Sequence, residues 1–129
     1  MDVVVEVGDW EHECCGPAIE RDQVVDLDCL RVVGDDGRVR LIETHHGDPA
    51  DERIQGRVTE LQVVQTGGTL RSVLRVPSGA ALLGNVSSDE GHLEDPWTGE
   101  PVESDSHDFL VTVRVPGWRT LGPSSASRA

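Results

Sequence analysis

The chain has 129 residues, the size of one domain, and is long enough to bury a single core without disulfides or metals, although only 36% of its residues are hydrophobic. Its 24 Asp and Glu residues outweigh 11 bases, all of them Arg, and the net charge is −13. Because such a chain repels polyanions, direct nucleic-acid binding and membrane binding are disfavoured. The charge suits a basic protein or a small ligand as the partner.

The N-terminal segment argues against export. It reads "MDVVVEVGD", with an acid at position 2 and an apolar run that stops at Val5, whereas a signal peptide needs a basic start and a longer apolar stretch. No segment has the apolar length of a membrane-spanning helix. Three Cys residues, an odd number, fit reduced thiols better than a disulfide framework. The sequence therefore predicts a cytoplasmic protein.

Alternation of apolar and polar residues predicts about six strands, because a period of two is typical of half-buried strands. In chain order they cover residues 2–7, 24–33, 38–44, 54–64, 70–76 and 109–115. The last of them, "FLVTVRV", has the most regular alternation. In the fifth, we expect Leu70, Ser72, Leu74 and Val76 to share one face.

Two of the connections read as hairpin turns. Gly67 and Gly68 separate the fourth and fifth strands, and Asp35, Asp36 and Gly37 separate the second and third. Within the fourth strand the apolar residues change parity near Thr59–Glu60, which predicts a β-bulge there.

Helix signals are short and few. The candidates are Pro49 to Ile54, with Asp48 as a possible N-cap, and Ser78 to Gly84. Strands joined by hairpins usually curl into a barrel or a sandwich. We therefore expect an all-β or mainly β fold, a small antiparallel barrel or sandwich that is OB-like or SH3-like, with at most one or two short helices.

The domain organisation follows from composition. Residues 1–119 are expected to form one β-rich domain, and residues 120–129 a disordered tail. Within the domain, residues 85–108 form a long acidic loop with eight acids and no base. A loop of this length is either mobile or functional. Its "DPWTG" turn carries Trp97, and packing of this side chain against the barrel would order the loop.

Two polar corners contain the residues that are best suited to metal binding or catalysis. The first is "WEHECCGP", from Trp10 to Pro17, and the second is "ETHHGDP", from Glu43 to Pro49. Thiolate and imidazole are preferred zinc ligands, and a candidate set is Cys14, Cys15, Cys29, His45 and His46. The paired-cysteine spacing of known zinc motifs is missing. The alternative, which we favour, is that the cysteines are small buried hydrophobic residues.

The sequence identifies no catalytic residue. It predicts no cofactor, and the alternative is a bound zinc ion. A Cys–His nucleophile pair would form only if the two corners met in space, and no cysteine-hydrolase signature is present. The favoured function is thus a non-catalytic binding module of acidic character. Trp10 and Trp97 are the candidate binding surface, since exposed aromatic residues are enriched at interfaces.

The chain resembles a family of small uncharacterised actinobacterial proteins. The resemblance rests on W-x-x-x-C-C-G from Trp10, D-x-V from Asp22, E-x-H-H-G from Glu43 and G-R-V at Gly56. It covers roughly the first half and the final strand, and leaves out the acidic loop. It implies a small intracellular domain of unknown function and supplies no catalytic residues.

Overall fold

The chain folds into a closed β-barrel in a computed structural model, which describes residues 1–8, 12, 16–44, 51–82, 92–104 and 106–116. Five strands form the ring: β1 (Asp2–Gly8), β3 (Val24–Val33), β4 (Val39–Glu43), β5 (Glu52–Val64) and β10 (Asp108–Arg114). Their order around it is β10, β1, β4, β3, β5, and the pairing of β5 with β10 closes it. This confirms the predicted small all-β fold.

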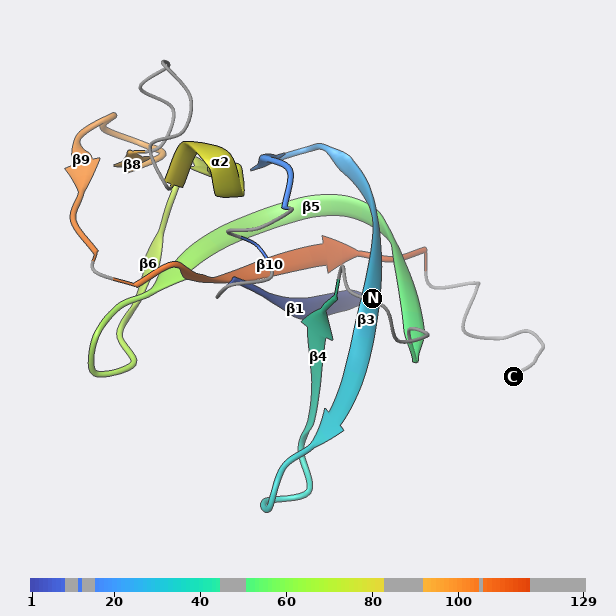
Figure 1. The fold of residues 1–129 in the computed structure, drawn as a ribbon. Helices are drawn as coiled ribbons and strands as arrows, with labels where there is room; N and C mark the ends of the chain where they lie inside the picture. Colours follow the sequence, from blue (N-terminus) through green and yellow to red (C-terminus); the bar gives the residue numbers. More distant parts are fainter. Residues whose placement is uncertain (9–11, 13–15, 45–50, 83–91, 105, 117–129) are drawn as a thin grey trace.

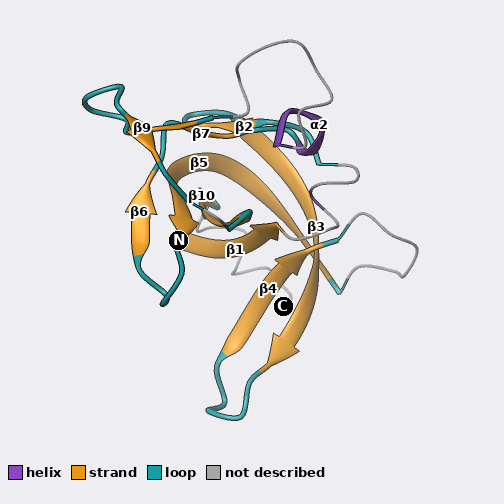
Figure 2. Cartoon of the chain, turned by 60° about the vertical axis from the view of Figure 1, so that its left-hand side comes forward, coloured by secondary structure: helices purple, strands orange, loops and turns teal. Residues whose placement is uncertain are grey.

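The neighbouring strands in the ring run antiparallel, except for β1 and β4. These two pair in parallel over a short stretch, Val5 with Leu41 and Glu6 with Ile42. Five strands cannot alternate direction all around a closed ring, so one parallel contact is required. The tip of the β3–β4 hairpin projects away from the barrel beyond this contact (Figures 1 and 2).

Short elements complete the molecule (Figure 2). β6 (Leu70–Ser72) extends the sheet from the edge of β5, β2 (Ile19–Glu20) pairs with β7 (Arg75–Val76), and β8 (Leu93–Glu94) pairs with β9 (Pro101–Val102). The one helix described is α2 (Gly79–Leu82). The described part of the chain includes no helix long and apolar enough to cross a membrane.

The core is aliphatic, as the composition demands. Alternate residues of the barrel strands point inward, and Phe109 is the one aromatic residue in the described core. The cluster comprises Val5, Val7, Ile19, Val25, Leu27, Cys29, Ile54, Val58, Leu61, Val63, Val73, Val76, Leu93, Val102, Phe109, Val111 and Val113. Burial of this surface is the main force that holds the barrel together.

The predicted bulge lies in β5. Glu60 pairs with Thr112 and Val58 pairs with Val113, so Thr59 is the extra residue of the bulged strand. The extra residue lets Val58 and Leu61 both face the core despite their odd spacing. A bulge also bends its strand, and Figure 1 shows β5 curving around the barrel.

Both predicted hairpin turns are present. Gly67 and Gly68 have φ values of 89° and 86°, in the region that side chains avoid. Gly68 N–H donates to the carbonyl of Gln65, which closes the turn between β5 and β6. In the other hairpin, Gly37 N–H donates to the carbonyl of Gly34.

Two local expectations were wrong. The segment from Leu70 to Val76 is two short strands, with buried Val73 between them, while Leu70 is exposed. The predicted helix from Pro49 to Ile54 overlaps β5, which begins at Glu52, because pairing with β3 outweighs local helix signals. The second predicted helix is confirmed, since α2 lies within Ser78 to Gly84.

Part of the acidic loop is ordered onto the barrel. β8 and β9 form a hairpin within it, and Leu93 and Val102 are buried in the core. The expected tail, residues 120–129, lies outside the described residues. The β8–β9 part of the acidic loop is thus packed at the end of the barrel where β5 and β6 join (Figure 1).

Candidate functional site

Most of the proposed zinc ligands lie outside the described residues. Cys14, Cys15, His45 and His46 are all in this group, as is Trp10, half of the predicted binding surface. The described residues hold no group of three or more His, Cys, Asp or Glu placed to bind a metal ion. The zinc site therefore stays a prediction.

Cys29, the remaining candidate ligand, is a core residue of β3. It is fully buried, and its backbone pairs with Glu43 of β4 and Glu52 of β5. Burial, together with the negative charge of Glu43 and nearby carboxylates, raises the pKa of this thiol to about 12. In this environment the thiol of Cys29 is therefore protonated at neutral pH.

The described part of "WEHECCGP" has a structural role. His12 is only 1% exposed, its Nε2 donates to the carbonyl of Pro77 over 2.6 Å, and its ring meets Phe109 edge to face. Gly16 N–H donates to the carbonyl of His12, and Gly79 N–H donates to that of Gly16. This corner thus joins the end of β1 to β7 and α2.

An open cavity of about 890 Å³ lies at the end of the barrel where the acidic loop packs. Its walls come from segments distant in sequence: the β5–β6 turn, α2, the β8–β9 hairpin and the approach to β10. The lining residues are Gln65, Thr66, Thr69, Leu82, His92, Leu93, Pro101, Val102, Glu103, Ser104 and His107. Cavities of this size in the mouths of β-barrels commonly bind small molecules.

Charge is distributed unevenly around this end cavity. The β5–β6 turn, "QTGGT", carries no charge, whereas the opposite wall comes from the acidic segment. Glu103 lines the cavity, and His92 Nε2 lies 2.5 Å from a carboxylate oxygen of Glu94. Gln65 Nε2 donates to the carbonyl of Glu103 over 2.8 Å, which fixes the two walls against each other.

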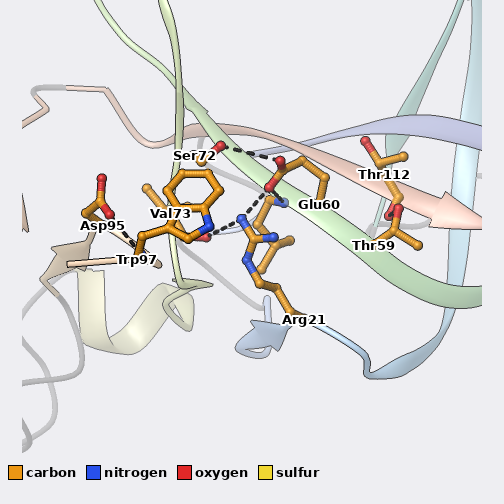
Figure 3. Close-up of polar contacts among 9 residues, drawn as sticks. Arg21, Thr59, Glu60, Ser72, Val73, Asp95, Trp97 and Thr112 are labelled. Carbon is orange, nitrogen blue, oxygen red and sulfur yellow. Dashed lines mark hydrogen bonds and ion pairs between the residues drawn. The ribbon is translucent and has the colours of Figure 1, made fainter. Parts of the chain in front are cut away.

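Trp97 lies at the tip of the β8–β9 hairpin and is 76% exposed, so the docking back onto the barrel that the sequence allowed does not occur. Asp95 accepts a hydrogen bond from the backbone N–H of Trp97 (Figure 3) and another from that of Thr98, and the two lower the pKa of its carboxyl. The turn therefore holds a large indole in solvent.

A polar cluster joins β5, β6 and the segment that follows β2 (Figure 3). The guanidinium of Arg21 forms an ion pair with Glu60 of β5 and donates to the carbonyl of Val73. Ser72 Oγ donates to the other oxygen of Glu60 over 3.4 Å. Glu60 directly follows the bulge, so the bulge aims this carboxylate at two other segments.

Sequence reasoning did not identify the end cavity. His92 and His107 are isolated in the sequence, and the β5–β6 turn reads only as a hairpin. The one available signal was the length and acidity of residues 85–108. The segments meet only because the barrel closes, which a local pattern does not reveal.

A model of the family described as "Family of unknown function (DUF6578)" matches residues 1–115. The match bears out the expected domain of unknown function and extends it beyond the first half to the acidic loop. No match was found among curated proteins or among solved structures.

Proposed function

The chain belongs to DUF6578, a family of unknown function, and we propose that it is a non-catalytic binding module whose end cavity takes a small organic cation. The observation that carries this proposal is the wall of the cavity built from the acidic segment. Residues 85–108 contain eight acids and no base, and none of the described residues that line the cavity is an Arg.

The lining chemistry supports a polar ligand with positive charge. The hydroxyl of Thr69 and the amide oxygen of Gln65 supply hydrogen-bond acceptors, while Leu82 and Leu93 supply apolar contact. The carboxylate of Glu103, together with the negative charge of the acidic segment, attracts a cation as it approaches. A low-dielectric wall beside them strengthens this attraction.

A basic protein is the second candidate for the partner, and the exposed Trp97 at the tip of the β8–β9 hairpin favours it. Trp side chains are frequent anchors of protein interfaces. A cytoplasmic location remains part of the proposal and is supported by the odd number of cysteines. The free, buried thiol of Cys29 agrees with it.

The test titrates the full chain with spermidine, an organic polycation, at low ionic strength, with glucose and citrate as neutral and anionic probes. Binding is followed by calorimetry. We expect saturable binding of spermidine alone, and Glu103→Gln should weaken it by roughly two- to fivefold, the range for an exposed charge pair.

The matched control is Glu20→Gln, because Glu20 lies on β2 outside the cavity lining and its removal changes the net charge equally. Equal weakening by both variants would mean that spermidine senses only the overall charge. Absence of saturable binding would reject the small-cation proposal and leave the basic protein as the candidate partner.

A further inference from the structure

A second cavity, of about 750 Å³, lies at the opposite end of β5. It is formed where β3 begins, where β5 meets β10, and where the described chain ends. The lining residues are Val24, Val25, Asp26, Gln55, Gly56, Arg57, Arg114 and Pro116. Two guanidinium groups thus stand beside an apolar surface, on a chain that is otherwise acidic.

The apolar part of this surface is exposed to solvent. Val24 is 66% exposed, while the adjacent Val25 belongs to the core. Pro116 also lines the cavity, and Gly56 adds no side chain. An apolar ligand would therefore cover Val24, at a gain of about 25 cal/mol for each Å² removed from water.

When the ion pairs of the second cavity are counted over the part of the chain that the structure describes, the guanidinium of Arg57 remains as a positive charge without a carboxylate. Arg53 binds Asp26 with two hydrogen bonds, which lower the pKa of that carboxyl, so the acid of the cavity already has its counter-ion. Arg114 Nε donates to Asp2 over 3.1 Å. Arg57 forms no ion pair with any carboxylate among the described residues, and its one hydrogen bond there is to a carbonyl.

That hydrogen bond positions Arg57. Its Nη1 donates over 2.6 Å to the carbonyl of Asp22, a residue with φ of 65° at the turn before β3. Asp22 is itself held, because its N–H donates to the carbonyl of Val58. A guanidinium has five N–H donors, so Arg57 is held by one and keeps the others for a ligand.

We propose that this second cavity binds a small apolar molecule with one carboxylate, such as an aliphatic monocarboxylate. The carboxylate lies on Arg57 with Arg114 beside it, and the hydrocarbon chain covers Val24 and Pro116. Arg forms strong, directional hydrogen bonds with carboxylates. The site is independent of the end cavity, which lies at the other end of β5 and favours the opposite charge.

The probe is octanoate, with octan-1-ol as the ligand of equal chain length that lacks the charge. The full chain is titrated with each, and binding is followed by calorimetry and by methyl NMR shifts of Val24. We expect saturable octanoate binding that shifts Val24, and weaker binding of octanol. Arg57→Gln should weaken octanoate about tenfold, because a charged hydrogen bond is lost.

Two variants separate this site from general charge attraction. Arg38→Gln removes the same charge from the exposed tip of the β3–β4 hairpin and should leave the affinity unchanged. Arg114→Gln should weaken octanoate less than Arg57→Gln. Thermal melts of each variant check that the barrel remains folded.

Three results would overturn the proposal. One is octanol binding as tightly as octanoate, and another is Arg57→Gln matching Arg38→Gln. The third concerns the chain's own C-terminal segment, which begins next to Pro116 and contains Trp118. Contacts between Trp118 and Val24 in the NMR spectrum of the free protein, with no octanoate binding, would make that segment the occupant.

Discussion

The thiol of Cys29 links stability to alkaline pH. Its pKa in the folded protein is raised from 9.0 to about 12, first by burial and then by the charge of Glu43. In the unfolded chain the thiol ionises near 9, so between pH 9 and 12 the folded state binds more protons. The free energy of unfolding should therefore fall as pH rises through this window and be unaffected below it.

Denaturant unfolding at pH 7, 9 and 10.5 measures this effect. Cys29→Ala should be less stable at pH 7 because it leaves a small cavity, yet it should lose less stability on going to pH 10.5. Cys14 and Cys15 are unchanged in this comparison. Equal alkaline losses in both proteins would show that the Cys29 thiol ionises as readily in the core as in water.

Gly16 packs closely against the ring of His12. A Cβ atom at Gly16 would lie 2.0 Å from His12 Nδ1, with other ring atoms almost as close, so the ring would have to move. That movement would disturb the hydrogen bond to Pro77. We expect Gly16→Ala to lower the free energy of unfolding by about 1–3 kcal/mol, the usual cost of overpacking.

A double-mutant cycle identifies the cause of that loss. With His12→Ala present, the added methyl group has space, so Gly16→Ala should cost clearly less than in the native chain. Chemical denaturation of the four proteins gives the coupling energy. An unchanged cost would place the origin in the backbone at Gly16 rather than in the contact with His12.

At the scale of elements, the sequence was informative where side-chain chemistry acts locally. Gly67 and Gly68 predict their turn because few other residues accept a positive φ. The parity change around Thr59 predicts the bulge because inward residues must be apolar on both sides of it. The alternation in β10 fixes which of its residues enter the core.

Local sequence patterns did not predict burial or strand pairing correctly where these depended on the position of a residue in the barrel. Leu70 lies on β6, at the edge of the sheet, so its side chain remains exposed although its alternation resembles a core strand. Glu52 and Arg53 look helical in isolation but pair with β3. The end cavity depends on residues from 65 to 107, which meet only after closure.

Closure itself can be tested at Gly56. A Cβ atom there would lie 2.2 Å from the carbonyl oxygen of Arg114 and 2.9 Å from its carbon. Since these are backbone atoms, the two strands would have to separate. We expect Gly56→Ala to destabilise the protein by about 1–3 kcal/mol and to speed amide hydrogen exchange at the end of β10.

Gln55→Ala is the matched control for Gly56→Ala, because Gln55 is the exposed neighbour on the same strand. It should leave exchange in β10 unchanged. If Gly56→Ala also left that exchange unchanged, the close approach of β5 and β10 would not be needed for closure. Gly56 lines the second cavity as well, so this variant should also weaken octanoate.

At the scale of the whole molecule, the charge is high but not uniform. The acidic segment supplies one wall of the end cavity, including Glu103, whereas Arg57 and Arg114 pair at the other end of β5. The described ion pairs are mostly exposed, as in Arg40 with Glu6 and Arg114 with Asp2, and exposed pairs stabilise little. Repulsion among the excess acids should therefore dominate the electrostatic contribution to stability.

This repulsion predicts how stability depends on salt. The Debye length falls from about 30 Å at 0.01 M to about 10 Å at 0.1 M, so added NaCl should screen the excess negative charge and raise the melting temperature by several degrees. Removing two exposed acids, with Asp35→Asn and Glu100→Gln, should reduce that rise. A melting temperature that falls with salt would instead show that the arginine pairs outweigh the repulsion, and that the −13 charge is already balanced in the folded protein.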